Sequence, residues 1–469
     1  MATEQQVTPH MRVYPLDPQK LTQEQIAVTF AMTSRSPEPF DEISRVVSEA
    51  KAADFNEKWV VGYGHASVAE HAVLHLAVEN VSRLACDELE DNRLASYTEK
   101  SSRYQILDRG SYHTPHELRG HALESLYVET CDHLFDVYHR LLEQTQDYLR
   151  GRDPQREGER DGAFRLRIRR IATDHCRFVL PASTLTNVGV TINARGLEHA
   201  ITKLLSSELA ESREIGERLK EEGRAIAPTL VKYADASDYL TDARRTERAS
   251  AWYRGPETGE SKGPGEVAVR LVSYDQAAEG KLAAALLYRV LGDSYDDVLQ
   301  RAAAMEPSER EQVIETALSG LGPFDAPLRE TELTDYIFEM EMDYGAYREY
   351  RRHRMQTTIP QRLEVSRGYV APFVVEEAGA MDLFREAMAT ADLAYRRLAE
   401  EFPSVAEYVV THAHKRRLLA KMNLRECYHL LKLRSAAQAH FTIREIALKC
   451  LHELRRVHPL LIKFIHLRD

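Results

Sequence analysis

The sequence predicts a mixed α/β protein of two tandem domains, each a sheet packed with long helices. Three observations indicate this fold class. Several short stretches alternate apolar and polar residues, as half-buried strands do. Longer stretches place apolar residues three and four positions apart, as amphipathic helices do. Finally, the second half of the chain repeats motifs of the first half in the same order.

The expected elements follow the same order in each copy. The alternating stretch 269–275 is a predicted strand, and the helical pattern at 279–291 follows it. The stretches 73–81 and 335–342 alternate as strands directly before the most polar motifs of their copies. Long amphipathic helices close each copy, as at 427–457.

The repeated motifs divide the chain into two domains. Asn193-Ala-Arg195 parallels Asn423-Leu-Arg425, and other pairs keep the same order. An ordered match of this kind indicates an internal duplication. A stretch between the copies is rich in glycine, proline and charge and has no apolar residue, which is typical of a linker. We expect a first domain, a linker and a second domain at 1–253, 254–266 and 267–469.

Composition excludes several classes of protein. The net charge of −11 argues against general nucleic-acid binding. No run approaches the length of a transmembrane helix, and the N-terminus lacks a basic start followed by an apolar run, so we expect a cytoplasmic protein without a membrane partner. The five cysteines are scattered and form no C-x-x-C pair, which indicates a reducing compartment and no structural zinc.

The densest cationic motif is Arg352-His353-Arg354. Arginine forks match phosphate geometry with two hydrogen bonds, and the pyrophosphate of a dinucleotide would compensate their charge. The alternative is a solvated helix end that forms ion pairs with nearby carboxylates. Those carboxylates are Glu339, Glu341 and Glu349.

A second polar motif runs from Gly64 to His71. His65 and His71 are six residues apart, do not share a helix face and have no third ligand nearby, so the motif does not predict a metal site. Ser67 followed three residues later by Glu70 is typical of a capping box at a helix start. Capping and ligand binding are compatible, and both interpretations stay open.

A third group, Asn423, Arg425 and Arg434, falls on one predicted helix. Asn423 and Arg434 are separated by about three turns and share a face. That face either directs polar groups into a site or forms a surface stripe. The chain has no glycine-rich strand–helix fingerprint, P-loop or nucleophile elbow, which argues against the Rossmann, P-loop and α/β-hydrolase classes.

Taken together, these motifs resemble the flavin-dependent thymidylate synthases, the ThyX family. The first copy resembles a nearly complete family domain, because it keeps the 64–71 motif and a loop with Glu99, Ser101 and Arg103. Asp91-Asn92-Arg93, however, stands where the family has Arg-His-Arg.

The second copy has the opposite losses. It keeps Arg352-His353-Arg354 and Arg434, but Arg362 replaces the loop serine, and Glu407 stands where the first copy has Arg177. Family members are homotetramers whose sites draw on several subunits. The resemblance therefore implies one composite pocket, with the first-copy loop on one side and the second-copy arginines on the other. It also implies a homodimer of tandem chains with half the usual number of sites.

The resemblance further implies reductive methylation of dUMP to dTMP. FAD would be the cofactor, NADPH the reductant and methylenetetrahydrofolate the one-carbon donor. The implied catalytic residues are Arg434, which favours the ionised uracil ring, and Ser101. The implied dUMP-binding residues are Glu99, Ser101, Arg103, Arg177, Arg352 and Arg434. The implied flavin-binding residues are His65, Ser67, Glu70, Asn193, Arg195, Arg352, His353, Arg354, Asn423, Arg425 and His429.

Two other functions fit the altered motifs. One is a flavoenzyme of the same fold that acts on another pyrimidine nucleotide. The other is a non-catalytic nucleotide-binding or scaffold protein, in which duplication has relaxed the constraints on both halves.

Overall fold

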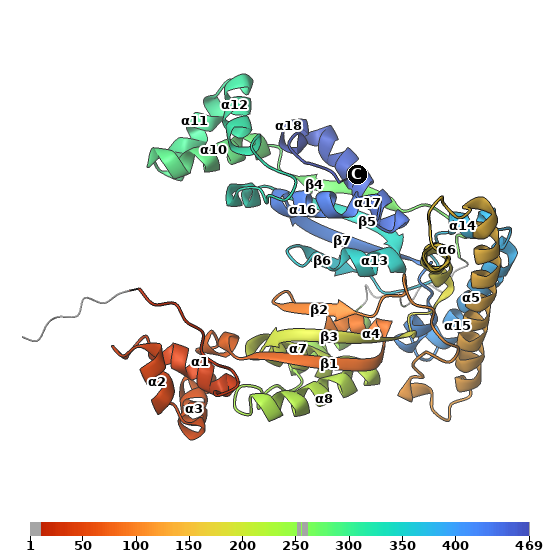
Figure 1. Cartoon of the computed structure of the whole chain (residues 1–469), viewed down its shortest axis with the longest axis horizontal. Helices are drawn as coiled ribbons and strands as arrows, with labels where there is room; N and C mark the ends of the chain where they lie inside the picture. The colour runs from red at the N-terminus through yellow and green to blue at the C-terminus, as the bar shows by residue number, and fades with distance from the viewer. Residues whose placement is uncertain (1–10, 251–254, 256–260, 469) are drawn as a thin grey trace, which may run out of the picture. The chain divides into compact units, whose positions relative to one another are not determined.

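The computed structural model describes residues 11–250, 255 and 261–468 (Figure 1). Residues 254 and 256–260 of the predicted linker lie outside these ranges. The chain forms two compact units, each built from separate stretches. Unit 1 consists of Met1–Glu79, Glu88–Glu99 and Asn187–Thr246, and unit 2 of Asn80–Asp87, Lys100–Thr186 and Glu247–Asp469. Both copies contribute to unit 2, and the copy boundaries at 253 and 267 stay a prediction.

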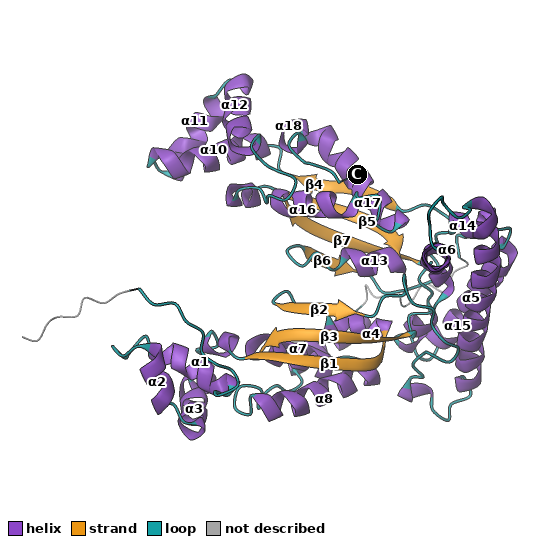
Figure 2. Cartoon of the chain, viewed as in Figure 1, coloured by secondary structure: helices purple, strands orange, loops and turns teal. Residues whose placement is uncertain are grey.

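Unit 1 holds most of a three-stranded sheet with the strand order β1-β3-β2 (Figure 2). The strand predicted at 73–81 is confirmed as β1. β2 runs antiparallel to β3, with Ala95 opposite Ile192. The strands are β1 (Val73–Ser82), β2 (Ala95–Glu99) and β3 (Leu185–Asn193). The helices are α1 (Gln23–Met32), α2 (Phe40–Val46), α3 (Glu49–Phe55), α4 (Arg83–Leu89, shared with unit 2), α7 (Ala194–Leu205), α8 (Ala210–Ile226) and α9 (Asp238–Ala249).

Unit 2 contains a four-stranded antiparallel sheet with the order β4-β5-β7-β6. Alternation places Tyr336, Phe338, Met340 and Met342 of β5 in the core, as the sequence predicts. The strands are β4 (Ala268–Tyr274), β5 (Asp335–Asp343), β6 (Thr357–Pro360) and β7 (Lys415–Asn423).

The helices of unit 2 confirm the predicted mixed α/β class. They are α5 (Glu124–Arg152), α6 (Asp161–Cys176), α10 (Ala278–Leu291), α11 (Tyr295–Ala304), α12 (Pro307–Leu318), α13 (Tyr344–Tyr350), α14 (Phe373–Glu377), α15 (Met381–Ala399), α16 (Leu424–Arg434), α17 (Phe441–Val457) and α18 (Pro459–Ile462). None of the helices in the described part of the chain combines the length and apolar character that spanning a membrane requires.

The single helix predicted at 427–457 is wrong, because the chain breaks it into α16 and α17. The Arg444 side chain donates to the backbone oxygen of Ser435 at 2.9 Å and satisfies a carbonyl beyond the end of α16. After the break, α17 packs against β4 and β5. The apolar spacing continues through the break, which is why periodicity alone joined the two helices.

Segments of the two copies pair directly inside unit 2. The backbone N–H of Ala182 donates to Val410, and that of His412 donates to Leu180, at 2.8 and 2.9 Å. A second pair of bonds joins 183 to 408 and 413 to 178. The bonds are reciprocal, as expected where equivalent segments meet across a local two-fold axis. Helix α5 of the first copy also packs along α15 of the second (Figure 1).

Candidate active site

The candidate site is a cluster of three arginines around one buried carboxylate in unit 2. The Glu349 Oε1 atom lies 3.7 Å from Arg103 Nη1 and 3.4 Å from Arg177 Nη2. Its Oε2 atom lies 3.2 Å from Arg434 Nη1. Arg103 and Arg177 come from the first copy, and Glu349 and Arg434 from the second. The cluster is therefore composite within one chain.

Helix caps place the second-copy side chains. The Asn423 side chain accepts the backbone N–H three residues further on and starts α16, whose last residue is Arg434. A cation is favoured at this end of a helix, where carbonyl groups are exposed. The buried Asp343 side chain caps α13 in the same way, and Glu349 lies near the end of that helix. These two caps fix where α16 and α13 begin.

A second carboxylate, that of Asp174, contacts two arginines of the cluster, Arg103 and Arg177. It receives a two-bond fork from Arg103, with distances of 2.9 and 3.2 Å from Nε and Nη2. His440 Nδ1 lies 2.9 Å from Oδ1 of the same carboxylate. Burial raises the pKa of the Asp174 carboxyl, but His440, Arg177 and Arg103 outweigh it and hold the pKa well below its usual range. Three arginines face two carboxylates, so positive charge is in excess.

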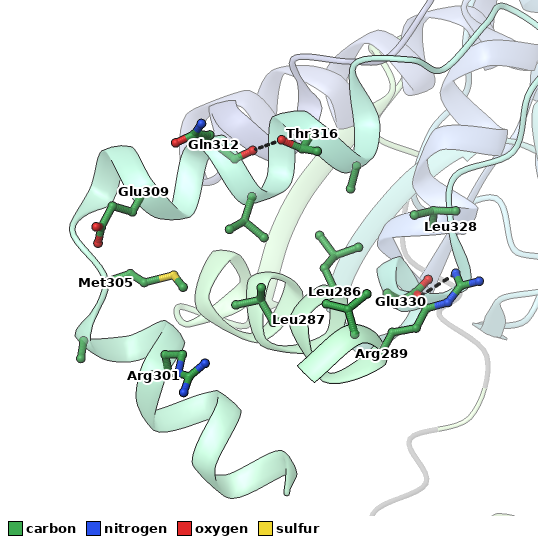
Figure 3. Close-up of a pocket in the computed structure, with 14 residues that line it drawn as sticks. Leu286, Leu287, Arg289, Arg301, Met305, Glu309, Gln312, Thr316, Leu328 and Glu330 are labelled. Atoms are coloured by element: carbon green, nitrogen blue, oxygen red, sulfur yellow. Dashed lines mark hydrogen bonds and ion pairs between the residues drawn. The ribbon is translucent and has the colours of Figure 1, made fainter. Parts of the chain in front are cut away.

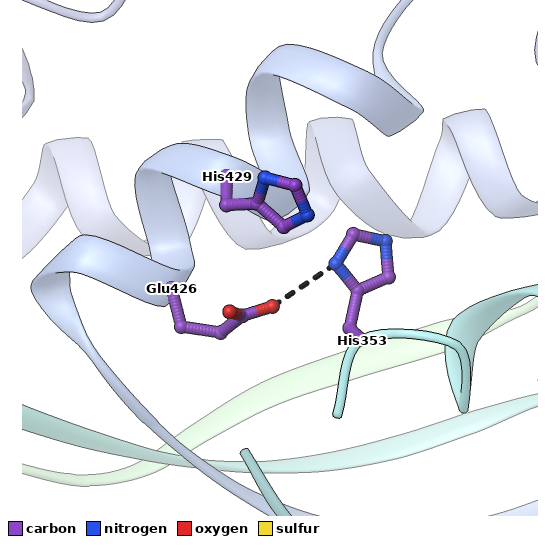
Figure 4. A group of neighbouring side chains, drawn as sticks. All are labelled: His353, Glu426 and His429. Carbon is purple, nitrogen blue, oxygen red and sulfur yellow. Dashed lines mark hydrogen bonds and ion pairs between the residues drawn. The ribbon is translucent and has the colours of Figure 1, made fainter. Parts of the chain in front are cut away.

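A hydrogen-bond chain runs from Arg434 through His353 to Glu426, and Figure 4 shows its last link. Arg434 Nε donates to His353 Nε2 at 3.0 Å, which leaves the proton on His353 Nδ1 to be donated to Glu426 Oε1, also at 3.0 Å. Burial lowers the pKa of His353 to about 3, with a further contribution from Arg434. Burial raises the pKa of Glu426 to about 7. His353 is thus a neutral, oriented link, not part of a solvated helix end.

The same region contains a group with metal-ligand chemistry. Ligand atoms of His353, Glu426 and His429 all lie within 4.8 Å of one another (Figure 4). Both ring nitrogens of His353 already have partners, one as acceptor from Arg434 and one as donor to Glu426. A metal ion on His353 would therefore have to displace one of these contacts. The arrangement is better described as a hydrogen-bond relay.

Three other predicted residues of unit 2, Asn423, Arg425 and His429, line the same cavity as Glu426. This cavity has a volume of about 350 Å³, and Arg425 forms an ion pair with Glu332 at 2.6 Å. The Ser101 hydroxyl accepts the backbone N–H of Arg103 at 3.2 Å and shapes the loop. Among the residues of the cationic motif, Arg352 is exposed and Arg354 half-buried.

The remaining predicted residues lie in unit 1. The predicted capping box is wrong: Ser67 makes no capping hydrogen bond, and the segment is one 3-10 turn, Val68–His71. Glu70 instead forms an ion pair with Arg195, next to Asn193, which caps α7. The two other residues of the prediction in this unit are Glu99, which is buried, and His65, whose ring lies near Trp59.

A second composite site would combine the first-copy counterparts of Arg352 and Arg434 with the second-copy counterparts of the loop and of Arg177. Several of these counterparts carry a different charge from the residues they correspond to. Either Lys203 or Leu204 falls in the place of Arg434 in the first copy, and Lys203 forms an ion pair at 3.1 Å with Asp91, which stands in the place of Arg352. In unit 2, Arg362 pairs with Glu407, which stands in the place of Arg177, at 3.4 Å. At each of these two places an acidic and a basic side chain form an ion pair. The group of cations found around Glu349 is therefore not repeated there.

Sequence reasoning missed two members of the cluster, Asp174 and His440, and the position of Glu349 among three arginines. Asp174 precedes Arg177 by three residues, a spacing that brings the two side chains together on a helix. This spacing could have indicated from the sequence that Asp174 lies beside Arg177. The contact between Glu349 and Arg103 joins residues far apart in the sequence, and no local pattern indicates it.

Another cavity of unit 2 is lined by none of the residues of the arginine cluster. It has a volume of about 1050 Å³ and lies among α10, α11 and α12 (Figure 3). Its lining is mainly apolar, with Leu286, Leu287 and Met305, and Arg301 and Glu309 add charge. No residue predicted for the site lines it.

The pH dependence of stability is expected to reveal His175, the neighbour of Asp174. Its ring stacks on Phe441 and burial lowers its pKa to about 3. The unfolded chain takes up a proton below about 6.5 and the folded chain does not, so stability falls as pH drops toward 3. Between pH 7 and pH 5 the wild type should lose about 2 kcal/mol relative to His175→Phe. Urea unfolding of both proteins at pH 7 and pH 5 measures the free energies of unfolding. An equal loss of stability in wild type and His175→Phe would contradict the prediction.

These features first define a class: a duplicated α/β protein whose two copies build an arginine cluster around buried carboxylates within one chain. The family described as thymidylate synthase complementing protein matches residues 18–229 and 270–460, which is most of the chain. The chain belongs to this family and carries its domain twice. The resemblance to flavin-dependent thymidylate synthases is thereby confirmed.

Relatives of two lengths agree with this assignment. A UPF0159 protein of Chlamydia muridarum is 33% identical over 435 residues, covering 89% of this chain and 82% of that protein. A UPF0159 protein of Thermoplasma acidophilum is 31% identical over 90% of each chain. A flavin-dependent thymidylate synthase of Clostridium tetani is 27% identical over 46% of this chain and 83% of its own length. One copy therefore corresponds to most of that shorter relative.

Proposed function

We propose that this protein is a flavin-dependent thymidylate synthase. It would convert dUMP to dTMP with methylenetetrahydrofolate as the one-carbon donor and NADPH as the reductant. The observation that carries the proposal is the cluster of Arg103, Arg177 and Arg434, which joins the two predicted sides of the pocket in one chain. Family membership and a relative named as a flavin-dependent thymidylate synthase support it.

In this proposal the arginine cluster receives the nucleotide. Arg103 and Arg177 bind the phosphate, together with Ser101 and Arg352. Arg434 lies against the uracil ring, where a fixed cation stabilises the negative charge that develops during the reaction. The contact from His353 to Arg434 orients the guanidinium, because one of its N–H groups is already committed. Glu99 supports the loop that carries Ser101.

The residues around the 350 Å³ cavity fit a flavin dinucleotide. Arg425, Lys432 and Arg468 supply cations for a pyrophosphate, and Asn423 supplies an amide. Met355 and other apolar lining residues suit an aromatic ring. His353, Arg354 and His429 would complete this side. Five residues of unit 1 are proposed as further flavin-binding residues: His65, Ser67, Glu70, Asn193 and Arg195. When bound, flavin supplies the hydride that completes the methyl group.

The proposed assembly is a homodimer of tandem chains with half the usual number of sites. The altered charges at Lys203–Asp91 and Arg362–Glu407 support it, because each replaces part of a cationic site with an ion pair. Sedimentation of the purified chain measures the assembly, and bound flavin per chain measures the number of sites. A value of about one flavin per chain is expected, and two would contradict the asymmetry.

Absorbance tests the proposed function most directly. Purified protein should absorb as a flavoprotein, alone or after addition of FAD, and dUMP with methylenetetrahydrofolate should stimulate NADPH oxidation and yield dTMP. Flavin binding with turnover of a different pyrimidine nucleotide would indicate the alternative enzyme. A protein that takes up no flavin would indicate a non-catalytic role and would overturn the proposal.

A further inference from the structure

The anion position of the arginine cluster is already filled by a side chain of the protein. The Glu349 carboxylate lies between Arg103, Arg177 and Arg434, and its side chain is 12% exposed. Arg434 Nη2 also donates to the backbone oxygen of Glu349 at 2.9 Å. Any phosphate-bearing ligand that binds Arg103 and Arg177 must therefore compete with this carboxylate.

Glu349 is a loose fit for this position. Its contacts of 3.2, 3.4 and 3.7 Å are longer than the roughly 2.7–2.9 Å of a strong charge-assisted hydrogen bond. The neighbouring Asp174 receives Arg103 at 2.9 Å, so the cluster can form short bonds. Three guanidinium nitrogens, one from each arginine, face the two oxygens of this carboxylate. A tetrahedral dianion has more acceptor oxygens and more charge.

We propose that Glu349 acts as an internal competing anion, which occupies the Arg103–Arg177–Arg434 cluster until a phosphate-bearing ligand displaces it. The proposal rests on the proposed function only for the identity of the nucleotide. Displacement favours a dianionic phosphate over monoanions, because only a stronger ligand recovers the contacts that Glu349 gives up. Glu349 is thus a residue that determines selectivity.

The competitor is present throughout the neutral pH range. Burial would raise the pKa of Glu349, but Arg177, His440, Arg103 and Arg434 together lower it below its ordinary value. The carboxylate therefore stays ionised, and protonation does not relieve the competition.

A purely structural role for Glu349 predicts the opposite result on mutation. If Glu349 only holds the arginines in position, Glu349→Gln should loosen them and weaken anion binding. If it competes, the same change should strengthen binding, because the amide keeps the shape of the side chain and removes its charge. The sign of the change separates the two roles.

Calorimetric titration of the full chain with inorganic phosphate and with dUMP tests the proposal. Glu349→Gln is expected to bind both about tenfold more tightly than wild type, equivalent to about 1.4 kcal/mol. Glu339→Gln removes the same charge from a residue that pairs with Arg270 outside the cluster, and its affinities should match wild type. Unchanged or weaker binding by folded Glu349→Gln overturns the proposal.

Two further measurements keep the test decisive. Should Glu349→Gln lose its native near-ultraviolet circular dichroism, Glu349→Asp keeps the charge and withdraws the carboxylate from the arginines, and it too should bind phosphate more tightly; equal or weaker binding rejects the idea. Tighter phosphate binding in a chain without flavin or turnover would retain Glu349 as the competitor and reject the proposed function. If the wild type turns over dUMP but neither variant binds phosphate more tightly, the competing role of Glu349 is rejected and the proposed function is retained.

Discussion

Replacing Arg434 with alanine is expected to lower kcat/KM for dUMP-dependent NADPH oxidation by about 100- to 1000-fold. Arg434 is the cation proposed to face the uracil ring, and it is also the donor that fixes His353. The developing negative charge would lose its fixed partner, and solvent would have to reorganise in its place. Steady-state kinetics with varied dUMP measure the loss.

Matched variants separate this effect from a general loss of charge. Arg352→Ala should abolish activity, because Arg352 lies on the proposed phosphate side. Arg362→Ala removes an arginine that pairs with Glu407 in the altered combination of copies, and it should leave activity close to wild type. Similar losses in Arg352→Ala and Arg362→Ala would contradict the asymmetric site. Near-ultraviolet circular dichroism confirms that each variant is folded.

Asp174→Asn is expected to destabilise the protein by about 3–5 kcal/mol, because it removes one partner of a buried ionic group. Arg103 loses its two-bond fork and Arg177 a carboxylate at 3.4 Å, so Glu349 is the carboxylate that remains beside both guanidinium groups. The low pKa of Asp174 means that its contribution is present at neutral pH and lost as pH falls through the folded-state pKa. Urea unfolding followed by near-ultraviolet circular dichroism measures the loss.

The control for this prediction is Asp382→Asn. Asp382 is 99% exposed and forms an ion pair with Arg385 at 2.9 Å, so its loss should cost less than about 1 kcal/mol. Equal effects of the two variants would show that the buried cluster contributes no more than a surface pair. A large effect at neutral pH that vanishes in strong acid would support the assignment to the charged form of Asp174.

The sequence predicted the elements whose patterns are local. Alternation was sufficient for β5, because one of its faces is buried and every second residue must be apolar. Helical spacing was insufficient at 435–440, because the apolar residues continue at helical intervals while the chain turns so that α17 can pack on the sheet. Ser67 and Glu70 fit a capping pattern, but an ion pair with Arg195 takes the Glu70 side chain.

The site was predictable only in part for a related reason. Motif resemblance predicts that Arg103 and Arg434 lie on opposite sides of one pocket, because the two copies keep complementary residues. It could not show that a carboxylate lies between them, since Glu349 follows an ordinary helical pattern and its partners come from distant segments. Electrostatic partners of a buried cluster depend on tertiary contacts, which single-sequence patterns do not encode.

The reciprocal backbone bonds between segments 178–183 and 408–413 have a consequence for biosynthesis. Segment 178–183 leaves the ribosome long before segment 408–413 is made. Its backbone groups stay without these partners until about half of the chain has been added. Contacts of such long sequence separation are slow to form. A ribosome that stops at the linker would therefore release a half-protein with an unpaired edge. Translation of the second copy completes the fold of the first.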